Sequence, residues 1–138
     1  MKEKEVIQHI VNWFLEYQKK SEAEGFVIGI SGGIDSSLTS TLAAKTTLPT
    51  LCIEIPIHQN KQQVERGRNH IKWLKKNFEN VTDVEIELTN VFDSFVENLP
   101  KSHKENNDLS LANVRARFRM TALYYYAQLN NYLVVGTG

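Results

Sequence analysis

Apolar positions along the chain follow two different spacings, and they predict strands that alternate with helices. Apolar residues three and four positions apart are typical of amphipathic helices, whereas short apolar or alternating runs are typical of strands. The predicted strands are residues 26–30, 50–55, 81–88 and 133–136. The predicted helices are residues 3–20, 38–45, 59–77, 89–99 and 110–130. This order favours an α/β fold with a doubly wound parallel sheet and right-handed crossovers.

The last predicted helix, residues 110–130, combines an unusually wide apolar surface with three arginines. Apolar positions nearly all round a helix predict burial on more than one side. Arg115, Arg117 and Arg119 then allow three interpretations. They are surface arginines lying over apolar neighbours, they form ion pairs at a subunit interface, or one of them binds a substrate phosphate through its planar fork.

Composition narrows the class of protein. The chain has 138 residues, of which 41% are hydrophobic and 23% charged, as expected for one globular domain, residues 1–138. Sixteen basic and sixteen acidic residues cancel, so the charge does not favour nucleic acid or a membrane surface as a partner. The sequence shows no signal peptide or membrane-spanning run, and Cys52 is its one cysteine, so we expect a cytoplasmic protein with an inert core thiol.

The most informative stretch is FVIGISGGIDSSL, residues 26–38. An apolar strand is followed by the glycine turn Ser31–Gly33 and then by residues that suit a helix start. Unpaired N–H groups at a helix N-terminus bind anions, and glycines allow a phosphate to approach the backbone closely. The stretch therefore predicts a phosphate-binding loop. The ordinary alternative is that Asp35 only favours the helix dipole while Ser36 or Ser31 caps the helix.

Two common phosphate motifs are excluded. No Lys follows the glycines, as the Walker loop requires, and the glycine spacing does not match GxGxxG. An acid, Asp35, lies where the Walker lysine would be. A carboxylate beside a polyphosphate is repulsive unless a cation lies between them, so Asp35 is a candidate Mg²⁺ ligand.

The segment SGGIDSS resembles the PP-loop of the N-type ATP pyrophosphatases, and NVRARFRM followed by an apolar strand and GTG resembles the ammonia-dependent NAD synthetases. The resemblance runs from the first helix to Gly138 and implies an adenine nucleotide α-hydrolase-like, Rossmann-type three-layer fold. It also implies a homodimer in which the first helix and the arginine-bearing helix help to form the interface.

Carried over by position, the resemblance assigns Mg²⁺ binding to Asp35 and deamido-NAD binding to Arg117. It assigns ATP binding to Gly29, Ile30, Ser31, Gly32, Gly33, Ile34, Asp35, Ser36 and Thr137. The reaction implied is ATP-dependent amidation of deamido-NAD with ammonia, through an adenylate, releasing AMP and pyrophosphate. No glutaminase feature accompanies these motifs, so free ammonia is the expected nitrogen donor.

The sequence also departs from the family pattern. Glu54 stands where the family often has an arginine, and Gln59, Lys61 and Gln62 are candidate substitutes for it. The acid that follows GTG in the family, which completes the metal site, is missing. We therefore expect an N-terminal portion, incomplete at its C-terminus, that alone binds Mg-ATP weakly and makes no NAD. Two alternatives stay open: another PP-loop adenylating synthetase, and a non-catalytic nucleotide-binding dimerisation module.

Overall fold

The computed structural model describes residues 2–101 and 107–136, and within them a parallel sheet has the strand order β3-β2-β1-β4. The strands are β1 (Gly25–Ile30), β2 (Thr50–Glu54), β3 (Val81–Glu85) and β4 (Tyr132–Val135). β1 and β2 are central, and in their register Ile30 lies opposite Glu54. The parallel α/β architecture predicted from the sequence is confirmed.

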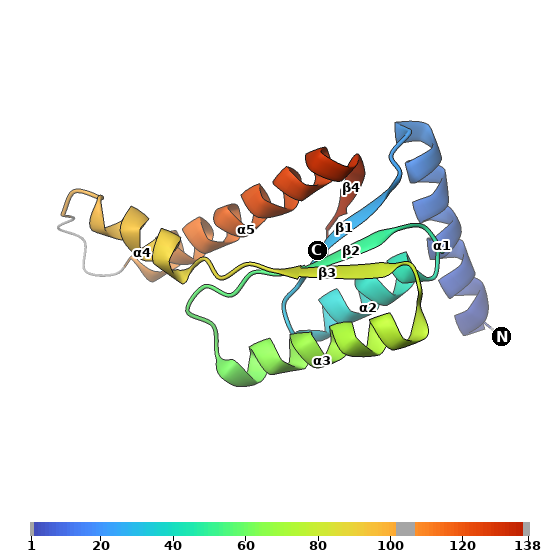
Figure 1. The fold of residues 1–138 in the computed structure, drawn as a ribbon, viewed down its shortest axis with the longest axis horizontal. Helices are drawn as coiled ribbons and strands as arrows, with labels where there is room; N and C mark the ends of the chain where they lie inside the picture. The colour runs from blue at the N-terminus through green and yellow to red at the C-terminus, as the bar shows by residue number, and fades with distance from the viewer. Residues whose placement is uncertain (1, 102–106, 137–138) are drawn as a thin grey trace.

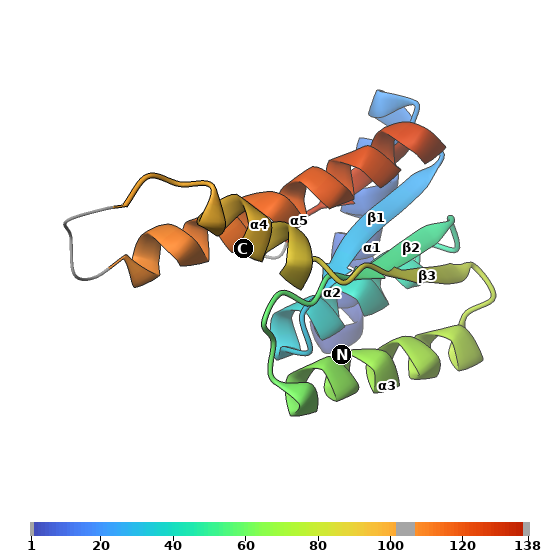
Figure 2. The same ribbon diagram turned by 60° about the vertical axis from the view of Figure 1, so that its left-hand side comes forward.

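Helices cover both faces of the sheet, which gives three layers (Figures 1 and 2). α5 packs on one face, while α2 and α3 lie on the other and α1 packs beside α2. The helices are α1 (Lys2–Ser21), α2 (Ile34–Ala44), α3 (Lys61–Asn77), α4 (Thr89–Glu97) and α5 (Asp108–Asn130).

The apolar sequence of β1 follows from its burial on both faces of the sheet. Successive side chains of a strand point to opposite faces, so Val27 packs against the α5 side while Ile28 and Ile30 pack against the α2 and α3 side. Both sides are covered, and the three side chains are 0%, 0% and 6% exposed. A strand buried on both faces reads as a continuous apolar run instead of an alternation.

Several boundaries differ from the sequence predictions. α2 begins at Ile34, not residue 38, with Gly33 as N-cap, so neither Ser31 nor Ser36 caps it. β3 ends at Glu85 rather than residue 88. Leu88 occupies the N-cap of α4, and the hydroxyl of the next residue, Thr89, accepts the N–H of His58 at 3.0 Å.

Within the chain, α5 is covered on one side only. Ala127 is its single fully buried residue among those described, and Ala122, Leu123 and Tyr126 pack on the sheet. Large apolar side chains elsewhere on the helix are exposed, namely Leu109, Met120, Tyr124, Tyr125 and Leu129. The predicted burial on more than one side is therefore not provided by this chain itself.

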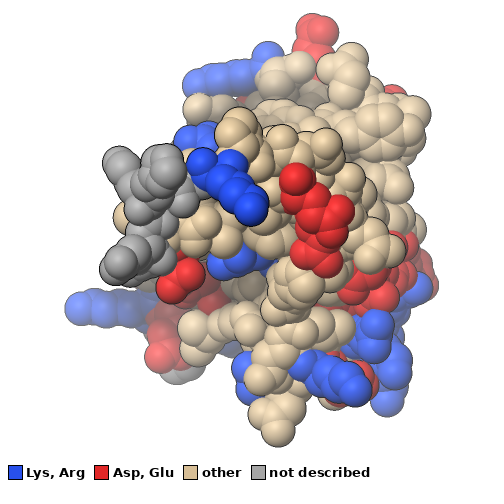
Figure 3. Space-filling view, turned by 90° about the vertical axis from the view of Figure 1, so that its left-hand side faces the viewer, with Lys and Arg blue, Asp and Glu red and all other residues tan. Residues whose placement is uncertain are grey.

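The surface charges agree with the balanced composition. Figure 3 views the end of the molecule where α4 lies, and basic and acidic side chains are interspersed on that face. None of the helices in the described part of the chain has the length and apolar character needed to cross a membrane.

Candidate active site

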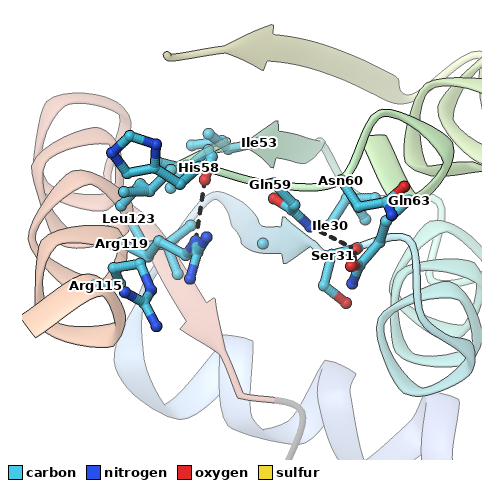
Figure 4. A pocket seen from close by; sticks show the side chains of 13 residues that line it. Ile30, Ser31, Ile53, His58, Gln59, Asn60, Gln63, Arg115, Arg119 and Leu123 are labelled. Carbon is cyan, nitrogen blue, oxygen red and sulfur yellow. Dashed lines mark hydrogen bonds between the residues drawn. The ribbon is translucent and has the colours of Figure 1, made fainter. Parts of the chain in front are cut away.

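A cavity of about 420 Å³ opens at the carboxyl ends of the two central strands, β1 and β2, and is bounded on one side by α5 (Figure 4). Ligands of open parallel α/β sheets bind at this edge. The lining residues are Gly29, Ile30, Ser31, Ile53, Ile55, Ile57, His58, Gln59, Asn60, Gln63, Arg115, Arg119 and Leu123.

The loop after β1 forms one wall of this cavity and leads directly into α2. Gly32 adopts φ +82°, a left-handed conformation that glycine tolerates best. The Ser36 hydroxyl accepts the Ser31 N–H at 3.1 Å and donates to the Gly33 carbonyl at 3.2 Å. These bonds close the loop on itself, and no side chain caps α2. The first N–H groups of the helix are therefore available to an anion.

Two glutamines hold the loop against the next crossover. Gln59 Nε2 donates to the Ser31 carbonyl at 3.1 Å, and Gln63 Nε2 donates to the same oxygen at 2.9 Å. Gln63 belongs to the first turn of α3, which Asn60 caps by accepting the Gln62 N–H at 2.7 Å. The start of α3 thus fixes the orientation of Ser31 at the cavity wall.

The opposite wall carries two of the three arginines of α5. Arg115 and Arg119 are four residues apart, so they share a helix face, and both line the cavity. The Arg119 Nε donates to the Ile55 carbonyl at 3.0 Å, and the Arg115 guanidinium lies 5.4 Å from the centre of the Phe92 ring. Burial and the neighbouring charge of Arg115 lower the pKa of Arg119 below its ordinary value.

Arg117 lies elsewhere. Two residues turn a helix by about 200°, so Arg117 projects from nearly the opposite side to Arg115 and Arg119. Its side chain is exposed, and it is not among the residues that line the cavity. The chain therefore does not bring Arg117 together with the loop at Ser31, and its assigned contact with deamido-NAD stays a prediction.

Glu54 ends β2 on the face away from this cavity, against α3. It is 5% exposed, and burial is the main cause that raises the pKa of its carboxyl to about 7. The charge of Glu85 raises it further, while that of Arg68 opposes the rise. Because it faces α3, Glu54 does not add a carboxylate to the cavity.

The remaining assigned residues fall on or beside the loop. Gly29, Ile30 and Ser31 line the cavity, whereas Ile34 and Asp35 lie exposed in the first turn of α2. Thr137 lies outside the described residues. In the described part of the chain no cluster of three or more His, Cys, Asp or Glu side chains could hold a metal ion. Asp35 can supply one hard oxygen ligand, and Mg²⁺ commonly takes its others from phosphates and water.

Sequence reasoning missed several residues at this cavity. Gln63 was not considered, although its position one turn from the capping Asn60 was a usable signal. The spacing of four between Arg115 and Arg119 also indicated a shared face. No local signal pointed to His58, whose Nε2 lies 2.6 Å from an oxygen of Asp93 on α4, because that pair joins residues 35 positions apart.

Comparison with known proteins agrees with this geometry. The chain is 36% identical over 133 residues to an NH3-dependent NAD+ synthetase of Malacoplasma penetrans, covering 96% of this chain and 51% of that protein. It is 37% identical to one from Saccharolobus solfataricus, covering 96% and 46%. The chain thus spans about half the length of the curated relatives it matches.

Solved structures of synthetases also resemble this chain. An NH3-dependent NAD synthetase from Campylobacter jejuni superposes with a TM-score of 0.85 at 30% identity, covering all of this chain and 57% of that one. An NMN synthetase from Francisella tularensis gives 0.84 at 34% identity, covering 98% and 54%. The NAD synthase family model matches residues 6–138. Because this match spans nearly the whole chain, the chain belongs to the NAD synthase family.

Proposed function

We propose that this protein adenylates the nicotinate carboxylate of deamido-NAD with ATP and then amidates it with ammonia to give NAD. The observation that carries the proposal is the loop of residues 31–36, which leads from the central strand into the uncapped start of α2 beside the cavity. Such a loop binds phosphate through backbone N–H groups. The relatives named above supply the substrate class.

In the first step the carboxylate attacks the α-phosphorus of ATP and pyrophosphate leaves, which gives an acyl-adenylate. In the second step ammonia attacks the acyl carbon, loses a proton and displaces AMP. The residues of this chain contribute by positioning the phosphates and by donating hydrogen bonds to charge that develops in the transition state. Gln59 and Gln63 keep the loop in place by holding the Ser31 carbonyl.

Mg²⁺ fits this site through Asp35. Its carboxylate lies exposed in the first turn of α2, two residues after Gly33. A bound Mg²⁺ would neutralise phosphate charge there. The exposed apolar side chains of α5, together with Trp13 and Tyr17 of α1, support assembly as a homodimer. A cytoplasmic location, expected from the single cysteine, stays a prediction.

The test is pyrophosphate release from ATP, measured for a version of the chain that is extended over the full length of the curated relatives. We expect release that depends on deamido-NAD and Mg²⁺, with NAD formed once ammonium is added. Nicotinate mononucleotide is the second substrate to assay, because one 34% identical structural relative is an NMN synthetase. Release driven instead by aspartate, xanthosine phosphate or tRNA would contradict the proposal, as would ATP binding without any release.

A further inference from the structure

Two guanidinium groups, those of Arg115 and Arg119, face the cavity, and none of the described residues balances them with a carboxylate. None of the described lining residues is acidic, and within residues 2–101 and 107–136 no salt bridge joins Arg115 or Arg119 to an acid. Arg68 on α3 shows the usual situation, since it donates two hydrogen bonds of 2.8 and 2.9 Å to Glu85. Two unbalanced positive charges lining a cavity indicate a site for an anion.

Arg119 is held in place by the backbone. Its Nε donates to the Ile55 carbonyl at 3.0 Å, just beyond the end of β2, which leaves the two terminal nitrogens of the fork for a ligand. The pKa of Arg119 is lowered by burial and by Arg115, so the charged group is disfavoured where it stands. A bound anion would relieve both effects.

Both walls of the cavity carry groups that donate hydrogen bonds. Figure 4 shows Ser31, Gln59 and Gln63 on one side and Arg115 and Arg119 on the other. The uncapped start of α2 follows the first wall, and the isoleucines of β1 and β2 line the space between. Hydrogen-bond donors on both sides of an apolar floor suit a phosphate group attached to an apolar ring system.

We propose that Arg119, assisted by Arg115, binds a phosphate group of the nucleotide held by the loop of residues 31–36. This inference rests on the proposed function, which supplies ATP as that nucleotide. Arg119 contacts the phosphate through its terminal nitrogens while its Nε stays on the Ile55 carbonyl. Arg117 takes no part, because it projects from another side of α5 and lies outside the cavity lining.

The test compares dissociation constants from titration calorimetry in the presence of EDTA, so that the result is independent of any metal. The ligands are ATP, inorganic tripolyphosphate, adenosine and deamido-NAD. Arg119→Lys keeps the charge but loses the fork, and we expect it to weaken ATP and tripolyphosphate about tenfold or more. Adenosine affinity should not change. Arg66→Gln removes an exposed arginine of α3 as the matched control and should stay within about twofold of wild type.

Arg115→Met is the second variant, because it leaves the bond between Arg119 and Ile55 intact if Arg119→Lys fails to fold. We expect it to weaken both anions several-fold. Unchanged ATP affinity in both folded variants would overturn the inference and leave the proposed function standing, as would weaker binding of deamido-NAD alone. A wild-type protein that binds tripolyphosphate but not ATP would retain the anion site and contradict the proposed function. Binding of neither would overturn both.

Discussion

A Cβ atom at position 67 would lie 2.7 Å from Oε2 of Glu54, so Gly67 lets α3 pack directly against a buried carboxyl. The same Cβ would lie 3.3 Å from Cγ2 of Ile30. Glu54 is 5% exposed at the end of β2, and Ile30 is its partner on β1. The glycine in the middle of α3 is therefore a packing requirement.

Gly67→Ala tests this requirement. Alanine is favoured over glycine in a helix interior by about 1 kcal/mol, but here its methyl group must displace Glu54. We expect a net loss of about 1–2 kcal/mol in the free energy of unfolding, measured with urea. In the Glu54→Ala background the carboxyl is gone and only the 3.3 Å contact with Ile30 remains, so the same substitution should cost clearly less or stabilise. Stabilisation in both backgrounds would show that Glu54 moves aside freely.

Glu54 should also make stability depend on pH. Its pKa is raised from 4.5 to about 7, so between these values the folded state binds more protons than the unfolded state. The free energy of unfolding should therefore fall as pH rises from about 4.5 to 7, by at most about 3 kcal/mol. Glu54→Gln should remove this fall and be more stable than wild type at pH 8.

The control for Glu54 is Glu79→Gln, which changes an exposed glutamate. Glu85 makes stability rise with pH, the opposite of Glu54, because its hydrogen bond with Arg68 lowers its pKa. Its contribution is present above the unfolded value and is lost as pH falls below it, outside the window of Glu54. Urea unfolding curves at pH 5 and pH 8 separate the contribution of Glu54 from that of Glu85. Burial lowers the pKa of His70, so His70 raises stability with pH in the same window, and the test is therefore the difference between wild type and Glu54→Gln. The same change in stability between pH 5 and pH 8 in both proteins would contradict the assignment to Glu54.

Gly32 is the residue of the loop that tolerates substitution least. At φ +82° an alanine costs roughly 1–2 kcal/mol, and its Cβ would overlap the Gln63 carbonyl. We expect Gly32→Ala to lower the free energy of unfolding by about 2 kcal/mol or more and to weaken ATP binding. Gly33→Ala is the matched control for stability, because Gly33 has φ −93° and its nearest contact would be Ser31 Oγ at 3.3 Å. Equal losses in the two variants would contradict this explanation.

The fold could be predicted largely because its central strands are buried on both faces. Such strands must be apolar nearly throughout, so β1 and β2 can be recognised in the sequence as short apolar runs. Boundaries were less predictable, since they depend on hydrogen bonds made in three dimensions. The Thr89 hydroxyl could cap α4, yet it pairs with the N–H of His58, 31 positions away.

The two walls of the candidate site differed in how far the sequence could predict them. The loop wall could be predicted because strand, glycines and helix start are contiguous in sequence. The arginine wall could not be assigned, because which face of α5 meets the sheet is decided by packing. Leu123 and Ala127 settle that orientation by lying on the sheet, and Arg115 and Arg119 share their side of the helix.

Asp35→Asn tests the metal role. The carboxylate is exposed in the first turn of α2, so its loss should change the free energy of unfolding by less than about 1 kcal/mol. In a version of the chain that is extended over the full length of the relatives, Mg²⁺-dependent pyrophosphate release should fall to the detection limit, because the amide is a poor ligand for this ion. The comparison is release at increasing Mg²⁺ in wild type and variant. Turnover near the wild-type rate would remove Asp35 from the metal site.

Arg117→Lys distinguishes a substrate contact from an interface contact. Arg117 is exposed and lies outside the cavity lining, so a contact with deamido-NAD requires a ligand that extends beyond the cavity or lies on another copy of the chain. If Arg117 holds a phosphate of deamido-NAD through its fork, lysine should raise the KM for that substrate about tenfold and leave the KM for ATP within about twofold. Sedimentation of the same samples reports the oligomeric state. Equal changes in both constants, or a dissociated assembly, would assign Arg117 to the subunit interface instead.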